Sequence, residues 1–364
     1  MSAVFISRSV SAVDGGGQLT ERNRKIVNSI GFDGGTYFFE VSVDGYYEKL
    51  VNSVLGRPYG FGRSLVDRLK SIMLGGGVQC VFIEHSLLAG YARYIKRWNP
   101  DVPIFIFYHN VEFHYYLHKS RVESIFNVVM LLLAWRNESI GRRFADHHVV
   151  LTRRDGMELK RLYGIDRAKV IPISLPYLSD QTDSGSLVSS GYHLYVGSNF
   201  FANIDGLCWY IENVLPYMKT KLVVVGKGME FLRSKYPAVL NLEILGYVED
   251  LTGFYRAADF FVNPVFVGSG MKTKTVEAFR HAKTVLGCKE AFVGFDIDFS
   301  GGETAFLCET AEQYSSAENE VLSDIPKYKF NASAKAYFSC YLSDEVVAAE
   351  FRSYFFEVSS NVSP

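Results

Sequence analysis

At 364 residues, with 48% hydrophobic and 21% charged residues, the chain has the composition of an ordinary folded protein, and its length favours two domains over a single core. Its formal net charge of -1 excludes a nucleic-acid binder that relies on overall positive charge, so any contact with a polyanion must be local. The five cysteines are scattered and form no Cys-x-x-Cys pair, which indicates neither a disulfide scaffold nor a zinc site and fits a reducing cytoplasm.

Short apolar runs alternate with amphipathic stretches through most of the chain, which is the pattern of parallel sheets covered by helices. In the first half, this pattern predicts strands at residues 4–6, 37–43, 79–84, 103–108 and 148–151. It predicts helices at residues 18–30, 62–73, 86–97, 119–143 and 154–163. A polar, aperiodic stretch follows, so we predict a first domain at residues 1–175 and a linker at residues 176–192.

Three glycines follow the first predicted strand: Gly15, Gly16 and Gly17. Because they have no Cβ, they would let the backbone approach a phosphate or an acceptor closely. They lack the Gly-x-Gly-x-x-Gly spacing of a dinucleotide-binding loop, so the loop alone is a weak signal.

The strand at residues 103–108 delivers His109, Asn110 and Glu112 at its carboxyl end, where ligands bind in open α/β sheets. His109 is therefore placed for chemistry, although a histidine at a strand end is more often structural. His114 and His118 follow closely, but their spacing matches no closed set of metal ligands.

The most lipophilic run, residues 125–135, contains Asn127 and is about half as long as a bilayer-spanning helix. Basic residues flank it: Lys119, Arg121, Arg136, Arg142 and Arg143. Two interpretations stay open, a core or interdomain helix and a surface helix that contacts anionic lipid. Residues 1–10 lack the long apolar core of a secretory signal, so we expect a cytoplasmic protein, with the inner face of the cell membrane as a site of peripheral contact.

The second half restarts the alternation. It predicts strands at residues 193–196, 222–225, 242–245, 260–262, 284–286 and 305–307, and helices at residues 205–218, 251–258, 312–322, 332–342 and 345–356. Four consecutive strands end at Gly197, Gly226, Gly246 and Asn263, and these ends would form a continuous rim where backbone can approach a nucleotide. We assign residues 193–342 to a second domain and residues 343–364 to a C-terminal helix that packs back on the first.

The last of these strand ends opens the stretch with the strongest site signal, residues 263–278. A glycine-rich turn leads into a helix that is predicted to begin near Met271, with Lys272 and Lys274 in its first turn. Free backbone N–H groups at a helix start favour an anion, and the lysines would add charge-assisted bonds to phosphate oxygens. Helical spacing places Lys274 and Glu277 on one face, and Glu277 suits sugar hydroxyls. The alternative is a solvated basic helix start in which Glu277 pairs with Lys274 or His281.

Several short motifs of the second half occur in the order found in one protein family. They lie at residues 196–198, 203–206, 225–228, 245–251, 258–264 and 268–278, with less sharp matches at residues 15–17 and 109–112. On these residues, the chain resembles family-4 (group 1) glycosyltransferases of the GT-B fold, of the bacterial surface-polysaccharide type. The resemblance implies an α/β protein of two Rossmann-like domains facing each other across a cleft.

The resemblance also implies an activity. A sugar would pass from a nucleotide-diphosphate donor, a UDP- or GDP-sugar on the second domain, to a saccharide or lipid-linked acceptor on the first, in polysaccharide or glycolipid synthesis. Family members retain the anomeric configuration and need no metal. No cofactor is implied, since the nucleotide-sugar is a substrate.

Residue roles follow from the resemblance by position. His109 would line the reacting centre, Glu277 would bind the donor ribose, and Lys272 and Lys274 would bind the diphosphate. The other donor-binding positions would be Gly197, Ser198, Gly226, Tyr247, Val248, Gly268, Ser269, Gly270 and Met271. Gly15, Gly16, Gly17, Asn110 and Glu112 would approach the acceptor or phosphates. We expect Lys274, on the Glu277 face, to matter more than Lys272.

The chain departs from the family pattern at some of these positions. Ser269 stands where many members have glutamate, and Ser198 and Asn203 stand where arginine and lysine are common. Asp296 and Asp298 resemble a metal-binding Asp-x-Asp, but they lie beyond the Glu277 helix, so we expect no metal role. Two further hypotheses stay open: a sugar-nucleotide epimerase of related fold, which needs no acceptor, and a nucleotide-sugar-binding subunit without catalysis.

Overall fold

The computed structural model describes residues 1–9, 15–42, 51–52, 57–120, 125–178 and 191–360. The chain forms two compact units, the first comprising Met1–Pro172 with Ala348–Pro364 and the second Ile173–Val347. Most of the linker predicted at residues 176–192 lies outside the described residues.

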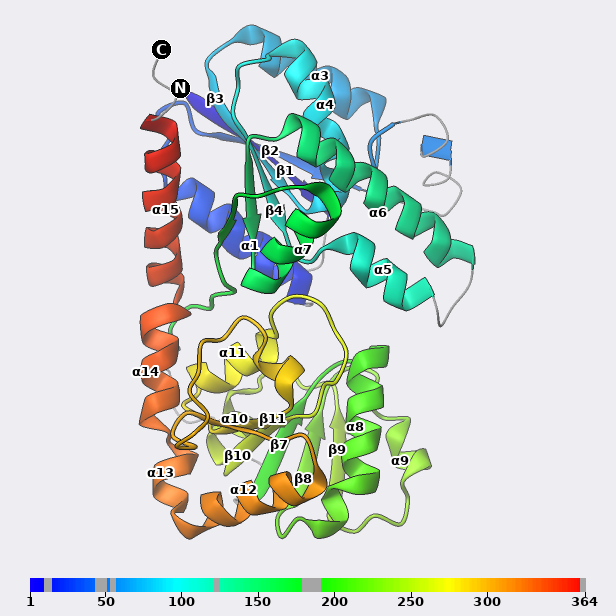
Figure 1. Ribbon diagram of the computed structural model, residues 1–364, viewed down its shortest axis with the longest axis vertical. Helices are drawn as coiled ribbons and strands as arrows, with labels where there is room; N and C mark the ends of the chain where they lie inside the picture. The colour runs from blue at the N-terminus through cyan, green and yellow to red at the C-terminus, as the bar shows by residue number, and fades with distance from the viewer. Residues whose placement is uncertain (10–14, 43–50, 53–56, 121–124, 179–190, 361–364) are drawn as a thin grey trace. The chain divides into compact units, whose positions relative to one another are not determined.

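The first unit contains a six-stranded parallel sheet in the order β2-β1-β3-β4-β5-β6 (Figure 1). The strands are β1 (Ser2–Arg8), β2 (Thr36–Val41), β3 (Val78–Glu84), β4 (Ile104–Tyr108), β5 (His147–Val150) and β6 (Ala168–Val170). The helices between them include α1 (Gly15–Asn28), α3 (Arg63–Gly75), α4 (Gly90–Trp98), α5 (Glu112–Ser120), α6 (Ile125–Phe144) and α7 (Arg153–Tyr163). The strand order reverses between β1 and β3, which is where a ligand crevice is expected in such a sheet.

Helices cover both faces of this sheet, so the central strands are buried throughout. Val4 and Ile6 of β1 share a hydrophobic cluster with Leu69 of α3, Ile95 of α4 and Leu133 of α6. Because side chains alternate along a strand, the residues between them face the opposite side of the sheet. This double burial explains why the strands read as continuous apolar runs rather than as alternating ones.

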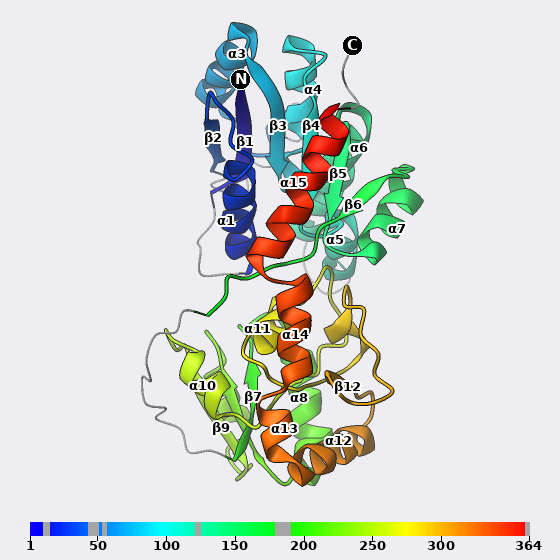
Figure 2. The ribbon, with the colours of Figure 1, turned by 90° about the vertical axis from the view of Figure 1, so that its left-hand side faces the viewer.

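The other face is covered by α15 (Asp344–Ser360), whose residues from Ala348 onward belong to the first unit. Figure 2 shows this helix lying over the strands. The ring of Phe355 lies 6.0 Å from that of Phe82 and 5.6 Å from that of Phe105, and Phe351 lies 5.4 Å from Phe107. The C-terminal helix thus completes the core of the first unit.

The stretch predicted as one helix at residues 119–143 is two helices, α5 and α6. α5 begins at Glu112 because the buried carboxylate of Glu138 accepts hydrogen bonds from the backbone N–H of Glu112 at 2.8 Å and of Phe113 at 3.3 Å. A carboxylate there satisfies N–H groups that a helix start leaves without an intrahelical partner. The cap comes from another helix, so no local pattern could predict it. Within the described residues, no helix combines the length and apolar character needed to cross a membrane.

The second unit contains another six-stranded parallel sheet, in the order β12-β11-β10-β7-β8-β9. Its strands are β7 (Tyr192–Val196), β8 (Lys221–Val225), β9 (Leu242–Gly246), β10 (Phe260–Asn263), β11 (Val285–Gly287) and β12 (Ala305–Leu307). Its described helices are α8 (Phe201–Asn213), α9 (Leu232–Lys235), α10 (Thr252–Ala257), α11 (Thr273–Arg280), α12 (Ala311–Ser323), α13 (Ile325–Lys329) and α14 (Ala332–Tyr341). The two units therefore repeat one architecture.

Two helices of the second unit begin elsewhere than predicted. α8 starts at Phe201 rather than at residue 205, which places Asn203 in its first turn. Gly206 of this helix packs directly on the chain after β10, where a Cβ would collide with the carbonyl oxygen of Pro264. α11 starts at Thr273, two residues after Met271, so Lys272 occupies the N-cap position without a capping side-chain hydrogen bond, and of the two lysines only Lys274 lies in the first turn.

Candidate functional site

Four neighbouring strands of the second unit end in glycine or asparagine. The order β10-β7-β8-β9 brings Asn263, Gly197, Gly226 and Gly246 to one edge of the sheet, which confirms the predicted rim. Gly226 has a φ of 156°, and a Cβ there would collide with the carbonyl oxygen of Gly197. The two strand ends approach each other more closely than side chains would permit, so the rim presents backbone groups to a ligand.

Lys274 projects from the first turn of α11 to the end of β7. Its Nζ donates to Asn203 Oδ1 at 2.7 Å and to the Tyr195 hydroxyl at 3.2 Å, and a Cβ on Gly197 would lie 3.1 Å from it. Burial, with a smaller contribution from the charge of Lys272, lowers the pKa of Lys274 to about 7. Because both hydrogen-bond partners are uncharged, an anion arriving at the rim would stabilise the ammonium form.

Asn203 has a role in this arrangement that the sequence did not indicate. Its side-chain amide donates to the carbonyl of Ser198 at 3.0 Å, while its oxygen accepts from Lys274. The residue that stands where the family often has a basic side chain therefore connects the end of β7 to the lysine of α11. It orients Lys274 without adding charge.

Lys272 has a different environment from Lys274. Its Nζ lies 2.8 Å from Glu290 Oε1 and donates to the carbonyl of Gly270 at 3.1 Å. Lys272 is thus paired with a carboxylate, and a phosphate would have to compete with Glu290 for it. This contrast favours the prediction that Lys274 contributes more to anion binding.

Glu277 pairs with Arg280 and with His281, whose Nε2 lies 3.4 Å away. The sequence left Lys274 or His281 as candidate partners; His281 is observed, and Lys274 instead contacts Asn203. Burial raises the pKa of Glu277, but the hydrogen bond from His281 and the charge of Arg280 outweigh it, so the net shift is downward. Glu277 is therefore an ionised acceptor, suited to sugar hydroxyls.

The turn before α11 is held in a fixed conformation. Gly270 has a φ of 63°, a left-handed value that favours glycine, and the next residue, Met271, is only 5% exposed. Gly268 lies on Lys272, whose Nζ would be 3.1 Å from a Cβ at that position, and Ser269 is partly exposed. The burial of Met271 anchors the helix start while the turn stays accessible from solvent.

Two residues assigned to the donor base lie at the far end of the rim. Tyr247 follows β9 and is 58% exposed, and Val248 is partly exposed beside it. An exposed aromatic ring at a strand end can stack on a base. Ser198, at the end of β7, is also exposed.

In the first unit, His109 follows β4 and its Nε2 hydrogen-bonds to Glu84, the last residue of β3. Glu84 is fully buried, and Asn23 Nδ2 of α1 lies 2.9 and 2.8 Å from its two carboxylate oxygens. The carboxylate is fixed from one side by an amide and holds the imidazole ring on the other. His109 therefore has a defined orientation, which a catalytic imidazole requires.

A second acid–imidazole pair lies beside it. His85 has a φ of 99°, rare for a residue other than glycine, and its ring centroid lies 5.0 Å from that of His109. Its Nε2 is 3.5 Å from Glu112 Oε1 and 3.3 Å from Arg8. Burial lowers the pKa of His85 well below its usual value, while burial and the charge of Glu138 raise the pKa of Glu112 to about 7. The imidazole therefore stays neutral beside a carboxyl group that holds its proton up to about pH 7.

The other residues predicted for the first unit differ in their placement. Gly15, Gly16 and Gly17 form the first turn of α1 rather than a loop before it, because the helix begins at Gly15. Residues 10–14, which precede them, lie outside the described part of the chain. Asn110 joins the acid–imidazole cluster, since its amide donates to Glu112 Oε1 at 3.3 Å.

Two of the residues that the sequence analysis weighed for a metal have other partners. His114 lies 3.4 Å from Glu158 Oε2 on α7, and Asp298 accepts a backbone hydrogen bond from Ser300. Among the described residues, no group of three or more histidine, cysteine or acidic side chains is arranged to hold a metal ion.

Sequence reasoning missed several residues of these two edges. Glu84 and His85 could have been found, because the rule that pointed to His109 applies equally to the neighbouring strand that ends at residue 84. Asn23 and Glu138 lie within helices, and only the folded chain brings them to the strand ends. Arg280 was missed as the second partner of Glu277.

Comparison with known proteins finds a family match within the second unit. Residues 191–324 match the family described as "Glycosyl transferases group 1". A Klebsiella pneumoniae protein described as "Uncharacterized 44.6 kDa protein in cps region" is 26% identical over 198 residues, which cover 49% of each chain. The match therefore spans about half the length of this curated relative.

Solved structures resemble the chain over nearly its whole length. Anabaena Alr3699/HepE in complex with UDP is 14% identical, with a TM-score of 0.67, over 98% of this chain and 100% of that one. The lipopolysaccharide outer core galactosyltransferase WaaB is 11% identical, with a TM-score of 0.64, over 98% and 99%. A Rickettsia africae glycosyltransferase is 12% identical, with a TM-score of 0.64, over 99% and 98%.

At such low identity these structures bear on the fold alone, and they confirm the predicted α/β class of GT-B type. The sequence match covers the strands of the rim and the α11 lysines. Over residues 191–324, the chain is similar to the group 1 glycosyl transferases.

Proposed function

We propose that the protein is a retaining glycosyltransferase that moves a sugar from a UDP- or GDP-sugar to a saccharide or lipid-linked acceptor in polysaccharide or glycolipid synthesis. The observation that carries this proposal is the position of Lys274, whose ammonium group lies against Gly197 at the rim and in the first turn of α11. A lysine combined with the N–H groups of a helix start forms an anion site. The diphosphate of the donor is the anion it would bind.

The rest of the rim suits the nucleoside part of the donor. Glu277, held ionised by Arg280 and His281, would accept hydrogen bonds from the ribose, and the exposed ring of Tyr247 would stack on the base. HepE has been solved with UDP and with UDP-glucose, which supports testing UDP-sugars first.

The chemistry follows from where charge develops. As the sugar–phosphate bond breaks, the departing nucleoside diphosphate gains negative charge, and a fixed ammonium with helix-start amides stabilises that state more than the ground state. We therefore propose that Lys274 and the start of α11 supply this stabilisation, with neither a metal nor a cofactor. Retention of configuration is proposed on the family resemblance.

The acceptor would be bound by the first unit. His109, fixed by Glu84, and the Glu112–His85 pair form a set of proton-exchanging groups at the carboxyl ends of β3 and β4. Such groups suit an acceptor hydroxyl that must lose its proton. The description of the Klebsiella relative as lying in a cps region supports an acceptor of surface polysaccharide synthesis. We propose a cytoplasmic location at the inner face of the membrane, where a lipid-linked acceptor would be within reach.

The proposal is tested by donor binding and then by transfer. UDP, GDP and their hexose conjugates are screened for thermal stabilisation, since a ligand that binds only the native state raises its stability with concentration. The best donor is then incubated with saccharide and lipid-linked acceptors, with and without EDTA, and the anomeric configuration of the product is read by NMR.

Transfer with retention, unaffected by EDTA, is expected. Absence of binding by every donor would overturn the proposal. Conversion of the donor without an acceptor would indicate an epimerase, and tight binding without transfer would indicate a non-catalytic subunit. An inverted product would overturn the stereochemical part alone.

A further inference from the structure

An apolar stripe lies on the outer face of α6. Val128, Leu132 and Trp135 follow one another at helical spacing and are 44%, 60% and 54% exposed. On the opposite side of the same helix, Leu133 and Ala134 are buried in the core of the first unit. The sequence allowed this hydrophobic run to be either a core helix or a surface helix. In the structure, one face of the helix is buried in the core and the other is exposed.

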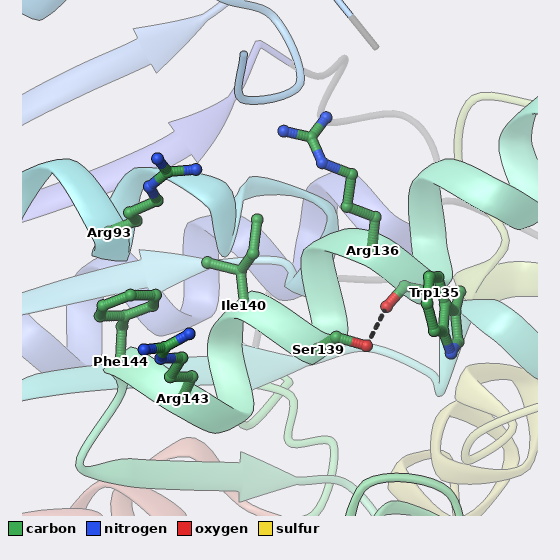
Figure 3. A pocket seen from close by; sticks show the side chains of 7 residues that line it. All are labelled: Arg93, Trp135, Arg136, Ser139, Ile140, Arg143 and Phe144. Atoms are coloured by element: carbon green, nitrogen blue, oxygen red, sulfur yellow. Dashed lines mark hydrogen bonds between the residues drawn. The ribbon is translucent and has the colours of Figure 1, made fainter. Parts of the chain in front are cut away.

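A hollow of about 560 Å³ adjoins this stripe (Figure 3). The seven residues that line it include three arginines and neither aspartate nor glutamate: Arg93, Trp135, Arg136, Ser139, Ile140, Arg143 and Phe144. Figure 3 shows Ile140 between the three arginine side chains, with Arg93 reaching in from α4 and the other two from α6.

The charges in this hollow are of one sign. Burial lowers the pKa of Arg136, and the nearby charge of Arg93 lowers it further. Arg136 also donates to the carbonyl of Arg57 at 3.3 Å, while Ser139 donates to its own helix at the carbonyl of Trp135. An anion placed among the guanidinium groups would relieve their repulsion, and a phosphate matches their forked geometry.

We propose that this hollow binds the phosphate of an anionic phospholipid at a membrane surface, with Val128, Leu132 and Trp135 inserted beside it between headgroups and acyl chains. This inference deepens the membrane location of the proposed function and rests on it. A phosphate in solution would satisfy the arginines but leave the apolar stripe in water. A lipid surface satisfies both, because the charged hollow and the stripe adjoin on one helix.

The chain provides a matched pair of variants. Arg142 and Arg143 are adjacent exposed residues of α6, but Arg143 lines the hollow whereas Arg142 lies beside Gly164. The full chain is sedimented with vesicles of phosphatidylcholine alone or with about one-third phosphatidylglycerol, where each basic residue near the surface contributes about 1 kcal/mol. Wild type should bind the anionic vesicles preferentially. Arg143→Glu should reduce that binding about tenfold or more, and Arg142→Glu by no more than about threefold.

Trp135→Ser should weaken binding to the anionic vesicles while leaving the sedimentation coefficient of the free protein unchanged. Equal losses for Arg142→Glu and Arg143→Glu would overturn the assignment of the hollow. Stabilisation by inorganic phosphate without vesicle binding would show that the hollow binds a dissolved anion and not a lipid. A dimer that requires Trp135 would show that a second copy of the chain covers the apolar stripe. UDP binding, measured on the same samples, separates the two proposals: a wild-type protein that binds UDP but not the anionic vesicles contradicts only this inference.

Discussion

Both sheets consist of six parallel strands, yet their carboxyl edges differ in chemistry. In the second unit the edge is backbone, with glycines at the strand ends and Lys274 beside them. In the first unit the edge carries carboxyl–imidazole pairs, with Glu84 on His109 and Glu112 on His85. One edge is suited to hold a fixed negative charge, and the other to move a proton. The residues after each strand, rather than the fold, determine which of the two an edge can do.

The largest effect is expected at the carboxyl edge of the second sheet, where we propose that the donor diphosphate binds. Lys274→Ala should lower transfer activity about a hundredfold, since it removes a positive charge placed where the leaving group gains negative charge. Donor binding should weaken at the same time, measured by titration with UDP or GDP. Lys221→Ala is the control, because Lys221 lies at the opposite end of β8 and pairs with Glu243.

Lys272→Ala sharpens the comparison within this edge. Lys272 is already paired with Glu290, so its loss should lower activity severalfold less than the loss of Lys274. Equal losses for the two variants would show that the pairing with Glu290 does not persist when donor is bound. Activity of Lys274→Ala within about twofold of the parent would contradict the assignment of the diphosphate site.

At the carboxyl edge of the first sheet, Glu84→Gln should lower kcat about tenfold with little change in the KM for the donor. The amide keeps the shape of the carboxylate but loses the charge that orients His109. The double variant Glu84→Gln with His109→Ala should be no slower than His109→Ala alone, because Glu84 acts through that ring. A rise in donor KM instead would place Glu84 among the binding residues.

Glu277→Gln tests the proposed ribose contact at the carboxyl edge of the second sheet. Donor affinity should fall about tenfold, because an ionised acceptor is replaced by a neutral amide. Thermal stability should change little, since Arg280 is partly exposed and can be hydrated, while the buried His281 stays neutral when its pKa is lowered by burial. A loss of stability that matched the loss of affinity would point to a structural ion pair.

The sequence predicted the two edges unequally. The glycine-terminated strands and the lysines of α11 form local patterns, so the rim could be predicted from residues close in the chain. The edge of the first unit depends on contacts such as Asn23 with Glu84, 61 residues apart, and Glu138 with Glu112, 26 residues apart. A buried carboxylate selects its partners through the tertiary fold, and neither periodicity nor spacing records that choice. α8 begins at Phe201, earlier than predicted, which lets Asn203 contact Lys274. This contact also depends on the tertiary fold, so the sequence pattern did not predict it.

The smallest effect, and the one that tests the two edges together, is the pH dependence of stability. Burial raises the pKa of Glu112 from 4.5 to about 7, so between these pH values the native state holds a proton that the unfolded chain has lost. The free energy of unfolding should therefore fall as pH rises through this range. Burial lowers the pKa of Lys274 from 10.5 to about 7, so here the unfolded chain holds the extra proton and stability should rise with pH above 7.

Denaturant unfolding from pH 4.5 to 10 separates the two contributions. Glu112→Gln should reduce the fall in stability between pH 4.5 and 7 by about 3 kcal/mol and leave the rise above pH 7, the basic limb, unchanged, and Lys274→Met should reduce the basic limb instead. Lys283, whose pKa burial also lowers to about 7, contributes to the basic limb and remains in both variants, so that limb is reduced rather than abolished. A donor diphosphate bound at Lys274 favours its charged form, so saturating UDP should reduce the basic limb of the wild type but not that of Lys274→Met. An equal effect of UDP on both would show that the nucleotide binds away from this lysine.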